Sequence, residues 1–216
     1  MRDVAIPKGA TCKGTHAYAP EEIVNMIEVL PEPARTVVAA AAFTGLRRSE
    51  LRGLQRGDID GNQIYVRRTV WNTIVEDRTK TDASRAPVPL VPMLRKWLEA
   101  HRNGQSETDF IFGGGRALNL ANLARRVISP TLQKEGSVKW QGRHGFRRGL
   151  ATNLSAIGTD EGVIQDILRH ADVKIRRSLY IKPTSESSQR AMKGIEKLFK
   201  SLRKANSHDE ANFGCV

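Results

Sequence analysis

The apolar run at residues 37–43 constrains the fold more than any other feature, because it contains no polar side chain. It predicts a helix over residues 32–43, and a helix that is apolar on nearly every side is stable only when the rest of a domain surrounds it. Directly after this helix come Arg47, Arg48 and Glu50. The sequence therefore predicts a domain built around one central helix, with a cluster of charge at the end of that helix.

Apolar residues recur at the spacing of a helix in several other segments. In residues 20–30 they follow a proline and two glutamates, which is typical of a helix start. A short helix is predicted over residues 49–54. Further helices are predicted over residues 92–103, 119–128, 143–157, 160–169 and 186–204.

The hydrophobic period changes after Asp60-Gly61-Asn62, which reads as a turn. Residues 63–75 are rich in Ile, Tyr, Val, Thr and Trp, and they predict two antiparallel strands, 63–68 and 70–75. The segment "APVPL" (86–90) predicts a third strand, placed at an edge because its prolines lack backbone donors. The predicted fold class is mainly α with a small three-stranded antiparallel β-sheet (α+β).

The chain divides into four parts by its patterns. Residues 1–18 show no periodicity and are predicted as a flexible tail or linker. Residues 19–184 form the main domain, residues 185–205 form a C-terminal helix, and residues 206–216 are predicted as a disordered tail.

Charge and cysteine content restrict the class of protein. Lys and Arg total 35 against 23 for Asp and Glu, a net charge of +12, which favours a polyanion and nucleic acid above all. The two cysteines form no disulfide framework and suit a reducing, cytoplasmic location. The sequence has no apolar run of about 18 residues, so no membrane span is expected. It has no HExxH pair or Cys/His cluster, so no metal or other cofactor is expected.

Besides the segment with Arg47, chemistry-bearing residues lie in three further segments. His144 and Arg147 share one face of a predicted helix in "HGFRRGLATNL". His170 follows the end of another predicted helix, Tyr180 comes ten residues later, and Lys80 lies in "KTDASRAPVPL". Taken singly, each has an ordinary explanation: a solvated cation, a satisfied histidine or a packed tyrosine.

Together, in the order R…K…HxxR…H…Y, these residues resemble the tyrosine recombinase (phage integrase) family in its catalytic domain. "TGLRRSEL" is similar to the first arginine motif of that family, and "KTDASRAPVPL" to its lysine hairpin. "HGFRRGLATNL" is similar to the HxxR box, and "ILRHADV" with the later tyrosine to the final motif. The resemblance covers about residues 18–183, so it implies that residues 19–184 are a catalytic domain.

The resemblance implies a role for each matching residue. Arg47 and Arg147 would clamp the scissile phosphate, and His170 would hydrogen-bond to it. Glu50 matches an acidic position that supports the site from behind the arginines. The adjacent Arg48 and Arg148 are expected to meet DNA backbone or solvent.

The remaining roles concern the nucleophile and the protons. The resemblance implies that Tyr180 attacks phosphorus and stays attached to the 3′ phosphate, that Lys80 is the general acid, and that His144 assists proton transfer. Such chemistry stores the bond energy in the phosphotyrosine, so neither ATP nor a metal is expected. The ten-residue spacing from His170 is one longer than is usual in the family, and the ninth position holds Leu179, so an extra residue or an altered helix is expected there.

The implied partner is double-stranded DNA, and the implied function is site-specific recombination or integration. Alternatives are a type IB topoisomerase-like enzyme, a telomere resolvase, a catalytically silent integrase remnant or, more distantly, an RNA-binding domain. Only about 18 residues precede the first predicted helix, where family members usually carry a DNA-clamping domain. The chain is then either an excised catalytic domain or a naturally short protein.

The predicted C-terminal helix carries an apolar stripe: Met192, Ile195, Leu198, Phe199 and Leu202. The stripe can pack against its own domain or dock into a neighbouring protomer. The resemblance favours docking in trans, because recombinases of this family act as tetramers with a swapped C-terminal segment. A homo-oligomer on DNA is therefore expected, assembled through this helix.

Overall fold

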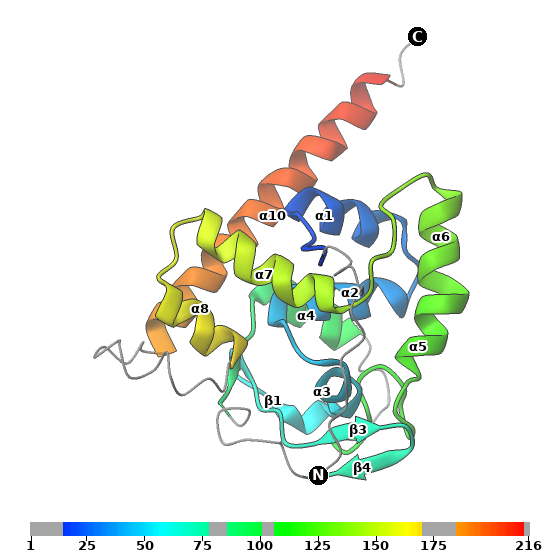
Figure 1. Ribbon diagram of the computed structural model, residues 1–216, viewed down its shortest axis with the longest axis vertical. Coiled ribbons are helices and arrows are strands. Elements are labelled where there is room, and N and C mark those ends of the chain that lie inside the picture. Colours follow the sequence, from blue (N-terminus) through cyan, green and yellow to red (C-terminus); the bar gives the residue numbers. More distant parts are fainter. Residues whose placement is uncertain (1–14, 78–85, 101–105, 170–184, 214–216) are drawn as a thin grey trace, which may run out of the picture.

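The computed structural model describes residues 15–77, 86–100, 106–169 and 185–213 (Figure 1). Helix α2 (Ala34–Thr44) is central, and residues 36–44 are all buried. It contacts α1 (Pro20–Val29), α4 (Pro92–Ala100) and α7 (His144–Ala156). The prediction of a central helix is therefore confirmed, and its C-terminal end is where the arginine segment begins.

The helices around α2 begin at the signals that the sequence carries. In α1, Pro20 occupies the first turn and the Ala19 amide donates to Glu22 Oε2 at 2.8 Å. Helix α8 (Glu161–Leu168) begins after Asp160, whose carboxylate accepts the Gly162 amide at 2.8 Å. The segment α5 (Leu120–Leu123), η3 (Ala124–Ile128) and α6 (Ser129–Lys134) is helical throughout, with a π-helical turn at η3.

The small three-stranded antiparallel sheet is confirmed, although its strands differ from the prediction. Its order is β1 (Ile59–Asp60), β2 (Gln63–Ile64) and β5 (Val88–Pro89), so the proline-bearing strand does lie at an edge. The predicted strand 63–68 ends at Ile64. It pairs with β1 and β5 rather than with the next predicted strand.

Residues 70–75 are not one strand but part of a separate hairpin. Strand β3 (Thr69–Trp71) pairs with β4 (Ile74–Glu76), and Trp71 lies opposite Ile74. Asn72 between them has a φ of 51°, which asparagine tolerates better than most residues do. Helix α3 (Arg48–Gly53) packs against β3 and holds this hairpin beside the arginine segment.

The C-terminal helix α10 (Ser185–Phe213) packs against α1, α7 and α8 of its own domain (Figure 1). From its predicted stripe, Met192, Ile195 and Phe199 are buried, and the Phe199 ring meets the Phe43 ring edge-on at 4.7 Å. The Met93 amide donates to Glu196 Oε1 at 2.8 Å. The stripe was correctly recognised, and in this single chain it packs against its own domain. Docking of this helix in trans stays a prediction.

Both predicted tails differ from the structure where it describes them. Tyr18, at the end of the predicted N-terminal tail, is fully buried. Helix α10 continues beyond residue 205, where the sequence predicts a disordered tail, and ends at Phe213. In the part of the chain that the structure describes, no helix combines the length and the apolar character needed to cross a bilayer.

Candidate active site

The loop between α2 and α3 positions the first arginine. Gly45 ends α2 with a φ of 60°, and its amide donates to the Ala41 carbonyl at 3.0 Å. A Cβ atom at Gly45 would lie 2.7 Å from a methyl group of Leu168. Glycine is therefore required here both by the left-handed backbone and by the close approach of α8. Two residues later the chain is extended at Arg47, which caps α3.

Glu50 holds Arg47 from behind. Its Oε2 accepts the Arg47 amide at 2.8 Å, and its Oε1 accepts a hydrogen bond from Arg47 Nη1 at 2.9 Å. The Glu50 side chain is 3% exposed, whereas that of Arg47 is 39% exposed. The guanidinium is thus fixed on one side and open to solvent on the other. The role that the resemblance implies for Glu50, support of the site from behind the arginines, stays a prediction.

Arg147 reaches the same loop from α7. Its Nη1 donates to the Gly45 carbonyl at 2.7 Å, and its Nη2 donates to the Leu168 carbonyl. Burial, and then the like charge of Arg47, lower the pKa of Arg147 to about 10, while Glu50 acts in the opposite direction. Arg147 therefore stays charged at neutral pH. The structure brings the two predicted clamp residues together although 100 positions separate them.

His144 occupies the first residue of α7, one turn before Arg147. Its side chain is exposed, so it can meet a ligand that rests on this end of the helix. Gly145 and Gly149 follow it on the buried side, where a Cβ atom would lie 2.7 Å from the Tyr18 ring and 2.4 Å from the Tyr18 carbonyl oxygen, respectively. The two glycines let α7 lie against Tyr18, and this contact fixes the helix that carries His144 and Arg147.

Arg169 belongs to this cluster and was missed by the sequence analysis. It is 1% exposed, and its Nη2 donates to Glu50 Oε2 at 2.7 Å. Burial alone would raise the pKa of Glu50, but the charges of Arg169 and then Arg47 outweigh it, so the pKa is lowered and Glu50 is ionised. The available signal was the place of Arg169 in the sequence, directly before His170 and after the apolar end of a helix.

The arginines adjacent to the clamp residues serve other contacts. The Arg48 guanidinium lies over the Trp71 ring, 5.7 Å from its centroid, and Arg148 Nε donates to the His16 carbonyl at 2.8 Å. Arg148 therefore fixes the segment before α1, rather than facing DNA or solvent alone as predicted. The selection of Arg47 and Arg147 as the clamp residues, made by motif register, stays a prediction.

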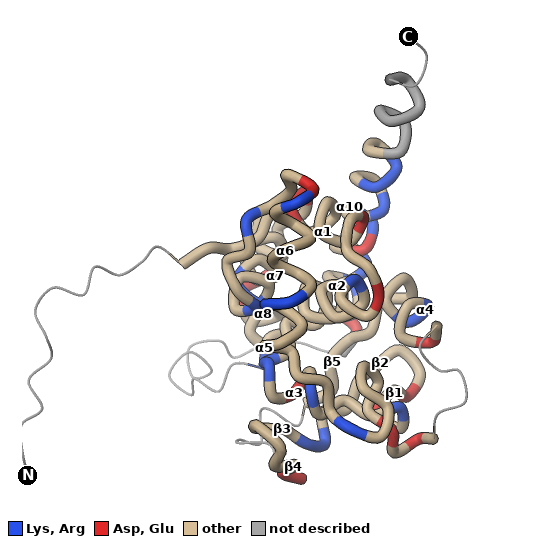
Figure 2. The backbone as a smooth tube through the Cα atoms, turned by 90° about the vertical axis from the view of Figure 1, so that its right-hand side faces the viewer, with Lys and Arg blue, Asp and Glu red and all other residues tan. Residues whose placement is uncertain are grey.

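Further arginines extend the positive charge from the site toward the hairpin and α5. Arg52 is buried and donates to the carbonyls of Leu118, Val70 and Asn72. Burial, and then the like charges of Arg48 and Arg52, lower the pKa of Arg143. Figure 2 shows basic positions on α3 and beside β3.

Two of the three tyrosines in the chain, Tyr18 and Tyr65, have structural contacts. The Tyr18 hydroxyl accepts the Gln141 amide at 2.6 Å, and burial raises its pKa to about 12. Its ring stacks on Phe146 with 4.5 Å between centroids. The Tyr65 hydroxyl donates to Gln63 Oε1 at 2.7 Å. Neither tyrosine shares a contact with the clustered arginines in the part of the chain described.

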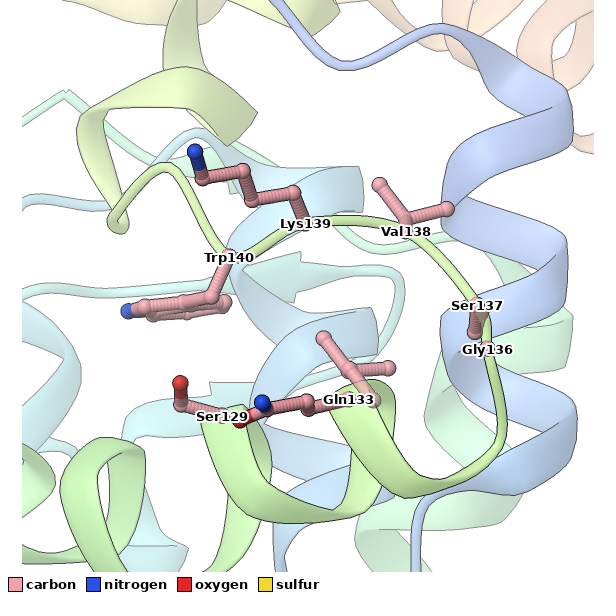
Figure 3. Close-up of a pocket in the computed structure, with 8 residues that line it drawn as sticks. Ser129, Gln133, Gly136, Ser137, Val138, Lys139 and Trp140 are labelled. Carbon is pink, nitrogen blue, oxygen red and sulfur yellow. The ribbon is translucent and has the colours of Figure 1, made fainter.

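A pocket of about 490 Å³ lies elsewhere, between α6 and the loop that follows it (Figure 3). Ser129 and Gln133 line it from α6, and Gly136, Ser137, Val138, Lys139 and Trp140 line it from the loop. None of the predicted catalytic residues lines it. The Trp140 ring also packs 5.9 Å from Phe146, so this wall supports the start of α7.

Lys80, His170 and Tyr180 lie outside the described residues, and their predicted roles rest on the sequence. Among residues 15–77, 86–100, 106–169 and 185–213, no three His, Cys, Asp or Glu side chains are grouped so that they could hold a metal ion. The described part of the site is therefore an arginine and glutamate cluster at the ends of α2 and α8, flanked by His144.

Comparison with known proteins identifies the family of this chain. The model of the phage integrase family matches residues 18–187, which is most of the chain. The chain belongs to the phage integrase family.

Among curated proteins, a tyrosine recombinase XerC of Mycobacterium leprae is 31% identical over 144 residues, which is 64% of this chain and 46% of the relative. A tyrosine recombinase XerA of Pyrococcus furiosus is 26% identical over 199 residues, covering 89% of this chain and 64% of the relative. The chain thus spans about half to two thirds of the length of these relatives.

Solved structures share the fold at low identity. The Tn1549 transposon integrase, in complex with transposon right end DNA, matches with a TM-score of 0.63 at 19% identity, covering 87% of this chain and 68% of that one. The XerA recombinase crystal structure matches with a TM-score of 0.57 at 22% identity, covering 87% and 65%. The mainly helical fold with its small antiparallel sheet is that of integrase and recombinase catalytic domains.

Proposed function

We propose that this chain is the catalytic domain of a site-specific DNA recombinase. It cuts and rejoins double-stranded DNA through a 3′-phosphotyrosyl intermediate and needs neither a metal nor ATP. The observation that carries the proposal is the convergence of Arg47 and Arg147 on the loop after α2, where Arg147 is held 2.7 Å from the Gly45 carbonyl. Family membership, and relatives that are named tyrosine recombinases, support it.

The two clamp residues suit a scissile phosphodiester. Guanidinium groups bind phosphate oxygens through paired hydrogen bonds, and they stabilise the extra negative charge that develops when phosphorus is attacked. Arg47 is fixed by Glu50 and open on its other side, so it can accept a phosphate without first being ordered. The site therefore supplies through fixed cations the charge neutralisation that other nucleases obtain from metal ions.

The covalent step exchanges one phosphodiester bond for another. The Tyr180 oxygen attacks phosphorus, the bond from phosphorus to the 5′ oxygen breaks, and the tyrosine remains joined to the 3′ phosphate. Lys80 gives a proton to the departing 5′ oxygen, while His144 and His170 assist proton transfer and bind the phosphate. The reverse attack by a 5′ hydroxyl of another strand reseals the DNA, and the bond energy is conserved without ATP.

The test is covalent trapping on DNA. A duplex is selected from a randomised pool by binding to the wild-type chain, and it is then nicked so that the cut 5′ end diffuses away. The wild-type chain should accumulate a protein–DNA adduct, and Tyr180→Phe should bind the duplex without forming it. Tyr65→Phe is the matched control and should form the adduct. An adduct that persists in Tyr180→Phe, or none with the wild-type chain, would overturn the proposal.

The same substrates test the finer parts of the proposal. Adduct formation should continue in a chelator without added nucleotide. Exchange of strands between two selected duplexes, rather than relaxation of supercoils alone, should separate a recombinase from a topoisomerase. Sedimentation on two duplexes should show a homo-oligomer if recombination uses more than one protomer.

A further inference from the structure

Arg169 combines two unfavourable features that call for an explanation. It ends α8 with a φ of 52° and a ψ of 49°, a left-handed conformation that disfavours any residue with a Cβ atom. Its side chain is also 1% exposed, and burying a cation is unfavourable unless the charge is paired. Glycine in place of Arg169 would avoid both difficulties, so the arginine side chain itself must contribute.

The partner of Arg169 is the residue that supports the phosphate clamp. Glu50 Oε2 accepts from Arg169 Nη2 at 2.7 Å, while Glu50 Oε1 accepts from Arg47 Nη1 at 2.9 Å. One carboxylate therefore joins two guanidiniums, one buried and one open to solvent. Because the pair is almost fully enclosed, its geometry is set by the protein rather than by water.

Arg169 also changes the charge that the clamp presents. Without it, Glu50 would pair with Arg47 alone, and the carboxylate would cancel the positive charge of Arg47. With it, the three arginines 47, 147 and 169 outnumber the single carboxylate, and a net charge of about +2 remains on these four side chains. A phosphate at Arg47 then meets an excess of positive charge.

The end of α8 is held to the site by a second contact. Arg147 Nη2 donates to the carbonyl of Leu168, the residue that precedes Arg169. Arg169 therefore attaches the end of α8 to Glu50 in α3. Arg147, which also donates to the Gly45 carbonyl, links the same end to the loop after α2. In the sequence, the predicted catalytic residue His170 follows immediately.

We propose that Arg169 is a positioning residue, which neutralises Glu50 and locks its orientation so that Arg47 keeps its charge and direction for the scissile phosphate. Arg169 does not touch the DNA in this scheme. The inference rests on the proposed function, since it needs a phosphate at Arg47.

The variants separate side-chain charge from backbone strain. Arg169→Gly removes the charge and suits the left-handed backbone, so it should fold, as checked by circular dichroism of the full chain. Its adduct formation at saturating protein should fall on the order of tenfold or more, with DNA affinity within about threefold of wild type. Arg169→Lys keeps a cation and should recover part of that loss. Arg169→Gly with wild-type adduct formation would overturn the proposal.

Two further readouts distinguish positioning from mere stability. In a Glu50→Gln background there is no carboxylate to neutralise, so Arg169→Gly should reduce adduct formation much less than it does in the wild-type background. An equal reduction in both backgrounds would contradict the proposal. On a substrate with a neutral methylphosphonate at the scissile position, the deficit of Arg169→Gly should shrink, whereas an unchanged deficit would contradict a charge effect. If the wild-type chain forms no adduct at all, the proposed function fails instead, and the two failures are therefore distinguishable.

Discussion

Replacing Arg147 with lysine should make DNA cleavage sensitive to pH near neutrality. Burial and the charge of Arg47 lower the pKa of Arg147 by between two and three units from its ordinary value to about 10, so the guanidinium remains charged up to about pH 9. A lysine has an ordinary pKa of about 10.4. If the same surroundings lower it equally, its pKa at position 147 falls to about 8.

The magnitude follows from the fraction of lysine that carries a proton. With a pKa of about 8, roughly 90% is charged at pH 7 and roughly 10% at pH 9, so the rate of adduct formation should fall about tenfold across this range. A single ammonium also replaces a guanidinium that donates to the carbonyls of both Gly45 and Leu168. A further loss of about tenfold, independent of pH, is therefore expected.

The assay measures adduct formation on the nicked duplex at several pH values and reports the ratio of variant to wild type. The ratio cancels every pH dependence that the two chains share. Arg35→Lys is a matched control, because Arg35 Nε also donates to a backbone carbonyl, that of Leu30 at 3.0 Å. Arg35 is near the start of α2, about 15 Å along the helix from the end that faces Arg147. A ratio for Arg147→Lys that stays constant from pH 7 to pH 9 would refute this reasoning.

Two other predictions concern the nucleophile chemistry and the C-terminal helix. Lys80→Ala should lose cleavage on ordinary DNA and regain it on DNA with sulfur at the 5′ bridging position, because that leaving group needs no proton; absence of rescue would remove Lys80 from the general-acid role. Phe199→Ala should lower the free energy of unfolding in urea by about 3–5 kcal/mol, because the ring is buried against Phe43. The exposed neighbour Lys197→Ala should change it by less than about 0.5 kcal/mol, and an equal effect would contradict the packing of α10 in cis.

Much of the fold could be predicted from the sequence because its signals are local. The apolar run in α2 and the proline and acids at the start of α1 can be read directly from the sequence, although α2 is stable only inside the folded domain. The hairpin β3–β4 was missed because the β-branched run around it reads as one continuous strand. The turn depends on Asn72 adopting a left-handed conformation, and Arg52 holds it by donating to the carbonyls of Val70 and Asn72.

Residues of the candidate site could be predicted where they belong to a sequence motif. They could not be predicted where only the fold brings them together. Arg47 and Arg147 were found by motif, and the structure places them at one loop. The pairing of Glu50 with Arg169 spans 119 positions, so no local pattern indicates it. The stripe on α10 was found by its period, but periodicity states only that a face is covered and not which surface covers it.

The close approach of three arginines is itself explained by the ends of two helices. The carbonyl groups at a helix C-terminus lack partners within the helix and carry about half a negative charge together. Arg147 donates to such carbonyls at the ends of both α2 and α8, while Glu50 supplies a full negative charge. The three guanidiniums carry three positive charges. The Glu50 carboxylate removes one and the two helix ends together remove about one more, so about one positive charge remains. The proposed binding of a phosphodiester needs that charge, and the charge exists only when α2, α3, α7 and α8 have folded together.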